Sequence, residues 1–168
     1  MRQFYDTFAT PFGDFSVALD ANGAVIATAF GGLPELRERF AADEVAHDPG
    51  RATEVRREIA EYFAGTRRHF TVKLSPSGTP FQQSVWAVLQ RIPFGETRSY
   101  GELAAEIGNP DAARAIGRAN ATNPICLLVP CHRVIGADGS LTGYAFGEVI
   151  KQQLLTHEGA AIAQPATA

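Results

Sequence analysis

The first thirty residues alternate between apolar and polar positions in three short runs. The runs are QFYDTFA, DFSVALD and AVIATAF, separated by Pro11-Phe12-Gly13 and by Asn22-Gly23. A period of two is typical of strands that bury one face, and Asn-Gly is typical of a tight hairpin turn. The pattern therefore predicts a small antiparallel sheet with a tight second hairpin.

A helical period replaces this alternation further along the chain. The spacing predicts a short charged helix over 34–42, an amphipathic helix over 53–63 and a third helix over 81–89. The stretch KLSPSGTP, residues 73–80, has the composition of a linker. We therefore expect an α+β protein with a sheet-and-helix domain over 1–76, a second domain over 77–160 and a disordered tail over 161–168.

Composition narrows the environment of the chain. Among 168 residues no apolar run approaches the roughly 20 residues of a membrane span, and the first residues lack the order of a signal peptide, so a soluble cytoplasmic protein is expected. The two cysteines are too few for a disulfide framework, and Cys126 lies in an apolar run typical of a buried strand. A net charge of −3 means that any contact with nucleic acid depends on local charge.

Residues 99–121 carry a helix-turn-helix pattern. Ser99 and Glu102 have the spacing of a capping box, and the helix that they begin should end at Gly108. Asn109-Pro110 then predicts a second helix that runs to about Ala121.

The second of these helices has two different faces. Its inward face consists of Ala112, Ile116 and Ala119, and its outward face of Arg114, Gly117, Arg118 and Ala121. The two arginines lie among residues with little or no side chain, and these small residues would let the helix backbone approach a partner closely. The alternative is an ordinary solvated arginine pair, because surface charges mostly keep proteins soluble.

The stretch VPCHRVIG, residues 129–136, raises three possibilities for Cys131: packing, metal binding or nucleophilic attack. His132 and Arg133 follow it, and a base and a cation can favour a thiolate. Neighbours in an extended chain point to opposite faces, so a bridging water is expected between the thiol and the imidazole unless the backbone turns. Glu148 and Glu158 are the downstream carboxylates that could hold the imidazole.

The second half of the chain resembles the O6-alkylguanine-DNA alkyltransferases, also called methylated-DNA–protein-cysteine methyltransferases. The motifs AARAIGRANATNP, NPICLLVPCHRVIG, GSLTGY and LLTHEG occur in this order between about residues 80 and 160. The resemblance implies a ribonuclease-H-like N-terminal sheet domain and a winged-helix-like C-terminal domain, with the GADGS hairpin as the wing. It also implies a DNA repair protein that flips O6-alkylguanine out of the duplex and transfers the alkyl group irreversibly to Cys131, once per molecule and without a cofactor.

The resemblance implies roles for individual residues. Cys131 attacks, His132 takes its proton through water and Glu158 orients the imidazole. Asn123 ties the hinge before the nucleophile, and Tyr100 donates its hydroxyl to the flipped base or to the neighbouring phosphate.

The implied partner is double-stranded DNA, bound by a monomer through the minor groove without regard to sequence. Arg114 would occupy the gap left by the flipped base. The other DNA-binding residues would be Tyr100, Ala113, Ala115, Gly117, Arg118 and Arg133. The substrate pocket would be lined by Val134, Tyr144, Ala145 and Phe146.

Two pocket positions differ from some members of that family. Where some members have a serine, Ala145 offers no side-chain hydroxyl to guanine O6. Where some have a glycine, Phe146 is expected to narrow the pocket, so that methyl adducts are accepted well and benzyl adducts poorly. Packing in the core is the alternative for Tyr144 and Phe146.

No metal is expected. The cysteines of the zinc site found in some relatives are absent, and the remaining histidines, His47, His69 and His157, lack companions at ligand spacing.

Three other functions compete with repair. Cys131 argues against a damage-binding relative without a nucleophile. A Cys-His hydrolase would need donors for an oxyanion, and a transcription regulator would need base-reading side chains, of which 112–121 offers few.

Overall fold

The computed structural model describes residues 2–41, 44–141 and 143–160. The chain forms two compact units: one contains the residues up to Gly78 together with Pro124–Leu128, and the other contains Thr79–Asn123 and the residues from Val129 onward. The first unit thus ends two residues after the boundary predicted at 76, and it includes a segment that the sequence assigned to the second domain. The tail predicted over 161–168 lies outside the described residues.

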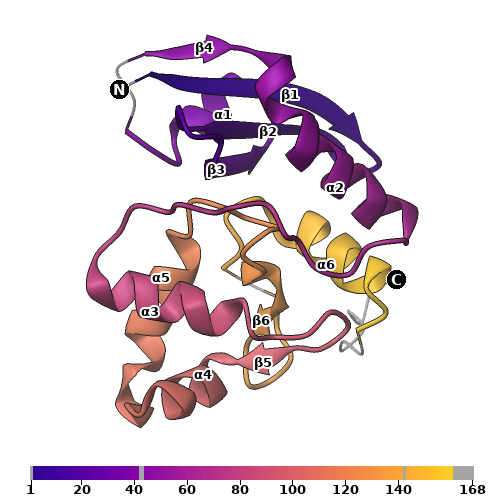
Figure 1. Cartoon of the computed structure of the whole chain (residues 1–168). Coiled ribbons are helices and arrows are strands. Elements are labelled where there is room, and N and C mark those ends of the chain that lie inside the picture. The colour runs from indigo at the N-terminus through magenta and orange to yellow at the C-terminus, as the bar shows by residue number, and fades with distance from the viewer. Residues whose placement is uncertain (1, 42–43, 142, 161–168) are drawn as a thin grey trace. The chain divides into compact units, whose positions relative to one another are not determined.

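The first unit is built on a four-stranded sheet with the strand order β3-β2-β1-β4 (Figure 1). The strands are β1 (Gln3–Thr10), β2 (Gly13–Leu19), β3 (Val25–Phe30) and β4 (Val45–His47). The first three are antiparallel, as the alternation predicts, whereas β4 pairs in parallel with β1 and was not predicted.

The second hairpin differs from the tight turn that was predicted. Its loop spans Asp20–Ala24, and the register of the strands shifts between Ala18 and Leu19. The Asp20 carboxylate accepts the N–H groups of Asn22 and Ala24 at 2.9 and 3.0 Å. The side chain of Asp20 therefore stabilises a longer loop.

Two helices pack against this sheet. Helix α1 (Leu33–Arg37) lies next to β2 and β3, and α2 (Thr53–Ala64), preceded by the short 3-10 helix η1 (Pro49–Ala52), lies next to β1 (Figure 1). The buried residues of α2 include Val55, Ile59 and Tyr62, as the helical period predicts. Helix α1 is shorter than predicted because Leu36 is its only buried side chain, which is too little apolar surface to stabilise a longer helix.

Glu58 ties the segment that follows α2 back to the helix. Its buried carboxylate accepts the N–H groups of Thr71 and Val72 at 2.8 and 3.2 Å, and it also accepts the Thr71 hydroxyl. Burial raises the pKa of the Glu58 carboxyl, but the hydrogen bonds from Thr71 and Val72 and the charge of Arg67 together hold it below its ordinary value.

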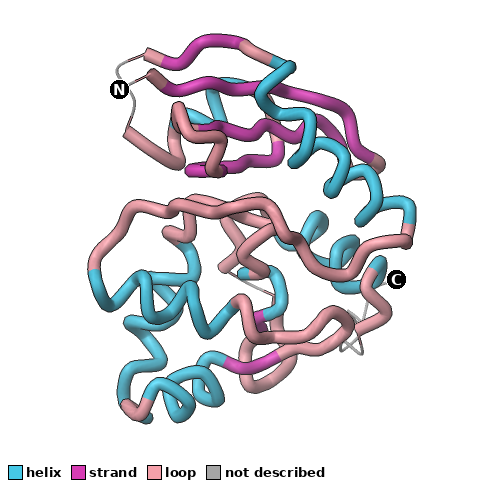
Figure 2. The backbone as a smooth tube through the Cα atoms, viewed as in Figure 1, coloured by secondary structure: helices cyan, strands magenta, loops and turns pink. Residues whose placement is uncertain are grey.

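The second unit is mainly helical, as Figure 2 shows. Its helices are α3 (Pro80–Leu89), α4 (Tyr100–Ile107), α5 (Ala113–Ala121) and α6 (Glu148–His157), with 3-10 helices η2 (Pro110–Ala112) and η3 (Cys131–Arg133). Its short strands β5 (Arg98–Ser99) and β6 (Val134–Ile135) pair in parallel. Within the described residues, no helix has the length and apolar character needed to cross a membrane.

Of the two helix starts predicted around Ser99 and Asn109, the first is confirmed and the second differs. The Ser99 N–H donates to the Glu102 carboxylate at 2.8 Å and the Glu102 N–H donates to the Ser99 hydroxyl at 3.1 Å, which confirms the capping box. Asn109 makes no side-chain cap, and the second helix begins instead as the 3-10 turn η2.

We predict that Glu58→Gln lowers the free energy of unfolding of the full chain at pH 7 by about 1–3 kcal/mol. The NH₂ group of the glutamine would then face the N–H and O–H groups that donate hydrogen bonds to the carboxylate in the wild type. The folded-state pKa is lowered, so the stability that Glu58 contributes is present above the unfolded value of about 4.3 and is lost as pH falls through the folded value. The variant should therefore lose less stability than the wild type when the pH falls from 7 to about 3.5. Urea unfolding at both pH values measures this. Glu54→Gln, at an exposed position of the same helix, is the control and should cost less than about 0.5 kcal/mol; equal losses for the two variants would contradict the assignment.

Candidate active site

Helix α5 carries the two faces predicted for it. Ala112, Ile116 and Ala119 are buried, whereas Arg114 and Arg118 are exposed. The α3 side chain Trp86 donates its indole N–H to the Ala119 carbonyl at 2.8 Å, which ties the inner face of α5 to α3. The outer face is therefore free to present its arginines.

A tight turn places Cys131. Pro130 has φ −80° and ψ 65°, and the Cys131 N–H donates to the Val129 carbonyl at 2.7 Å across it. Asn123 Nδ2 donates to the same Val129 carbonyl at 2.9 Å. The Asn123 side chain is thus tied to the backbone two residues before Cys131.

A second tight turn lies three residues earlier in the chain. Leu127 has φ 72°, and it is the only non-glycine residue with a positive φ in the described part of the chain. The Leu128 N–H donates to the Cys126 carbonyl around it at 2.9 Å. A bulky residue rarely adopts this conformation, so the approach to the active-site segment stores backbone strain.

Residues 131–133 form a 3-10 turn, so the backbone turns where an extended chain was the default expectation. Cys131 is 4% exposed and His132 is fully buried. His132 Nε2 lies 2.8 Å from Glu158 Oε2. Arg133 donates from Nε to Glu158 Oε1 at 2.8 Å, from Nη2 to Glu158 Oε2 at 3.0 Å and from Nη1 to the Ile92 carbonyl at 2.7 Å.

This geometry resolves one alternative and corrects one expectation. Glu158, rather than the exposed Glu148, is the carboxylate that holds His132. The prediction that Arg133 contacts DNA does not fit its place, because the guanidinium is buried and its N–H groups bind Glu158 and Ile92. A bidentate pair of this kind positions a carboxylate.

The charges around His132 determine its tautomer. Burial lowers the pKa of the imidazole, Glu158 raises it, and Arg133 and Lys151 lower it, with a net shift below the ordinary value. The ring is therefore neutral at pH 7. Because an ionised carboxylate only accepts hydrogen bonds, the ring proton is on Nε2.

The other ring nitrogen of His132 is left as an acceptor. Nδ1 is buried and has no hydrogen-bond partner in the part of the chain that the structure describes. Burial raises the pKa of the Glu158 carboxyl, but His132 and Arg133 outweigh this and hold it far below its usual range. A neutral imidazole with an open Nδ1 and an anion behind it can act as a general base.

Tyr100, at the start of α4, lies near Cys131 and between two glycines. A Cβ atom at Gly117 would lie 3.8 Å from the ring, and one at Gly143 would lie 3.4 Å from the hydroxyl. Burial raises the pKa of Tyr100, as does the charge of Cys131, while a hydrogen bond with Asn120 opposes the shift. The net rise keeps Tyr100 protonated at neutral pH, so its hydroxyl can donate.

Two buried polar residues near Cys131 were not predicted from the sequence. Asn120 Nδ2 donates to the Cys131 carbonyl at 3.3 Å, and its side chain also hydrogen-bonds Tyr100. Lys151 is fully buried on α6. Both occupy helix positions whose neighbours are apolar and buried, such as Ile116 four residues before Asn120, and this periodicity could have identified them.

The predicted pocket residues are placed as follows. Val134 is buried, and its N–H donates to the Cys131 carbonyl. The rings of Tyr144 and Phe146 meet edge to face with centroids 5.7 Å apart, while Ala145 is exposed.

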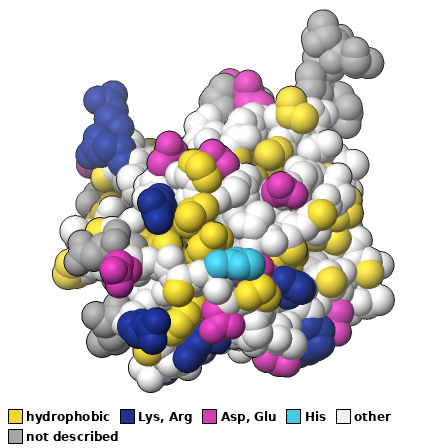
Figure 3. Space-filling view, turned by 90° about the horizontal axis from the view of Figure 1, so that it is seen from above, with side chains coloured by type: hydrophobic (Ala, Val, Ile, Leu, Met, Phe, Trp, Pro, Cys, Tyr) yellow, Lys and Arg dark blue, Asp and Glu magenta, His cyan; other side chains and the backbone are white. Residues whose placement is uncertain are grey.

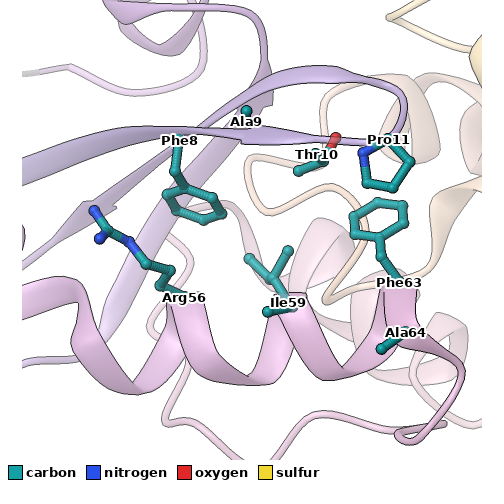
Figure 4. Close-up of a pocket in the computed structure, with 9 residues that line it drawn as sticks. Phe8, Ala9, Thr10, Pro11, Arg56, Ile59, Phe63 and Ala64 are labelled. Atoms are coloured by element: carbon teal, nitrogen blue, oxygen red, sulfur yellow. The ribbon is translucent and has the colours of Figure 1, made fainter.

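Other parts of the molecule offer less chemistry. A groove of about 450 Å³ in the first unit lies between the end of β1 and α2, and Figure 4 shows Phe8, Ile59 and Phe63 lining it with Arg56 at one end. Its lining includes no cysteine, histidine or carboxylate, and Arg56 is paired with Asp6. On the face in Figure 3, basic and acidic side chains are interspersed among apolar ones. No three His, Cys, Asp or Glu side chains of the described ranges come together to hold a metal ion.

Comparisons with known proteins agree on one family. The family model for the DNA-binding domain of 6-O-methylguanine DNA methyltransferase matches residues 80–160. The chain is 47% identical to the methylated-DNA–protein-cysteine methyltransferase of Methanosarcina acetivorans over 156 residues, which cover 93% of this chain and 98% of the relative. It is 42% identical to the constitutive methylated-DNA–protein-cysteine methyltransferase of Bacillus subtilis over 157 residues, which cover 92% and 94%.

A solved structure extends the likeness to the fold. The structure of Mycobacterium tuberculosis OGT in complex with DNA matches with a TM-score of 0.84 at 43% identity, covering 93% of this chain and 92% of that one. The resemblance predicted from the motifs is confirmed, and it extends over both halves of the chain. The chain belongs to the family of methylated-DNA–protein-cysteine methyltransferases.

Proposed function

We propose that this protein repairs DNA by transferring the alkyl group of O6-alkylguanine to Cys131 in a single irreversible turnover. The observation that carries the proposal is the buried Cys131-His132-Glu158 arrangement, with its neutral imidazole and open Nδ1. The similarity to methylated-DNA–protein-cysteine methyltransferases supports transfer of a methyl group from DNA to a cysteine. The DNA in the Mycobacterium tuberculosis structure supports DNA as the partner.

The chemistry is a displacement at carbon. His132 Nδ1 accepts the Cys131 proton through a water, and the resulting thiolate attacks the alkyl carbon. A carbon–sulfur bond forms, the bond between that carbon and guanine O6 breaks, and the bonding electron pair stays on the guanine. Tyr100 donates a hydrogen bond to the leaving base. The thioether that results has no low-energy leaving group, so each molecule reacts once.

DNA binding is assigned to α5. The exposed Arg114 occupies the space of the flipped base, which offsets part of the few kcal/mol that extrusion costs. The small residues Ala113, Ala115 and Gly117 allow close approach to the minor groove without base-specific contacts. With Arg133 buried, Arg118 is the second exposed cation of this surface.

Two finer features of the fold belong to the same proposal. We infer a helix-turn-helix from α4 and α5, which are joined at Gly108 with φ 88°, and a wing from the turn at Gly136–Ser140, where the Gly136 N–H donates to the Ser140 carbonyl at 2.9 Å. The mixed sheet of the first unit fits a ribonuclease-H-like arrangement.

Mass spectrometry after incubation with a DNA duplex that contains one O6-methylguanine tests this function. The expected product is a single added methyl group on Cys131, one per molecule, with no addition in Cys131→Ser. Arg114→Ala should slow the reaction on duplex DNA roughly tenfold or more, because nothing then fills the gap in the base stack. An unmodified Cys131, or release of the methyl group with repeated turnover, would contradict the proposal.

We predict that Phe146 restricts the pocket. Its edge-to-face contact with Tyr144 leaves an aromatic ring beside the expected substrate space. Free O6-benzylguanine should inactivate the wild type slowly, and Phe146→Gly should speed this by roughly ten- to a hundredfold while changing repair of O6-methylguanine little. Phe81→Gly, at a partly exposed aromatic of α3, is the control. Rapid inactivation of the wild type by the benzyl base would show that the ring does not narrow the pocket.

A further inference from the structure

Lys151 is a buried amine that the proposed mechanism does not use. It is 0% exposed, and its Nζ has no hydrogen-bond partner among the described residues. The chain contains only one other lysine, the exposed Lys73. A buried ammonium without a compensating charge is strongly unfavourable, so the position requires a charged neighbour.

The helix that carries Lys151 packs against the turn that carries the nucleophile. Leu154, Leu155 and Glu158 follow Lys151 at spacings of three, four and seven residues, so all four share one face of α6 and its C-terminal end, and all are buried. Helix α6 contacts η3. Lys151 and Glu158 are therefore the two charges that this face brings to the Cys131 turn.

Three titratable groups interact electrostatically with the Lys151 ammonium. Cys131 and His132 belong to η3, and Glu148 lies one turn earlier on α6. Glu148 is exposed, so water screens its charge. His132 is neutral at pH 7 and is already held by Glu158. The buried group that can supply a negative charge to Lys151 is therefore the Cys131 sulfur.

We propose that Lys151 is the counter-charge of the Cys131 thiolate, stabilising the sulfur anion that forms when the thiol loses its proton. Alkylation of Cys131 then removes the negative charge that faces Lys151, because a thioether is neutral. That an O6-alkylguanine supplies the alkyl group rests on the proposed function, whereas the stabilisation of the thiolate by Lys151 does not depend on DNA repair.

The acidity of Lys151 agrees with this role. Burial lowers the pKa of its ammonium, the charge of Cys131 and then that of Glu148 oppose this shift, and the net pKa is about 8. When the sulfur becomes neutral, the largest of the opposing contributions disappears. The alkylated protein should therefore release the Lys151 proton to solvent at a lower pH than the unmodified protein does.

The first test measures alkylation of Cys131 by iodoacetamide between pH 5 and pH 9, with Cys131→Ser giving the background from Cys126. Lys151→Met should raise the pH of half-maximal rate by roughly one to two units, the size expected for a partly buried charge pair. For Lys151→Arg, which keeps the charge, the pH of half-maximal rate should stay close to that of the wild type, and for the matched control Lys73→Met it should be unchanged.

The stability of Lys151→Met is a control for unfolding. Methionine removes a buried charge without leaving a large cavity, so the thermal stability of the variant should be equal to or higher than that of the wild type, and unfolding would not explain a shift in the pH of half-maximal rate.

The second test follows the two lysines by NMR of carbon-13-labelled protein, assigned with Lys73→Arg. Because coupling between two sites is reciprocal, alkylation of Cys131 by iodoacetamide should lower the pKa of Lys151 by about the amount that Lys151→Met raises the thiol midpoint. An unchanged midpoint in Lys151→Met, or an unchanged Lys151 titration after alkylation, would overturn the inference. Since iodoacetamide requires no DNA, failure of the O6-methylguanine assay alone would count against the proposed function and leave this inference standing.

Discussion

One buried carboxylate organises the active site. Glu158, at the end of α6, accepts hydrogen bonds from the imidazole of His132 and the guanidinium of Arg133 at 2.8 to 3.0 Å. A buried anion costs several kcal/mol of lost hydration, which only close partners can offset. Arg133 supplies the charge and also binds the Ile92 carbonyl, so the arginine fixes the carboxylate and the carboxylate fixes the imidazole. Removing either side of the pair would leave the other charge buried and unpaired.

The backbone around the nucleophile is held by a second, uncharged set of contacts. The Val129 carbonyl accepts hydrogen bonds from the Cys131 N–H and from Asn123, and the Cys131 carbonyl accepts them from the Val134 N–H and from Asn120. These hydrogen bonds hold the main chain on both sides of Cys131. In the proposed reaction, such preorganisation would reduce the entropy that must be lost when an alkyl carbon is brought into line for attack by Cys131.

Local patterns predicted the elements that local interactions determine. The period of α2, the Ser99 capping box and the inner face of α5 follow from neighbours within one or two turns. The three-residue strand β4 was missed because its pairing with β1 joins segments about forty residues apart. The prediction that Arg133 contacts DNA was wrong because it also depends on a contact between distant residues. An isolated arginine is usually exposed, and its burial is explained only by Glu158, 25 residues later in the chain. The burial of Lys151 could have been predicted from the sequence, because Leu154 and Leu155 follow it at spacings of three and four residues and so place it on the apolar face of α6.

The chemistry proposed for this site requires that burial keeps His132 neutral and that Glu158 holds the ring proton on Nε2, which leaves Nδ1 as an open acceptor. Nitrogen-15 NMR of the histidine rings measures this directly in the free protein, and His132→Gln assigns the resonance among the four histidines. We expect a neutral ring at pH 7, protonated at Nε2 and unprotonated at Nδ1. A ring protonated at Nδ1, or at both nitrogens, would contradict it.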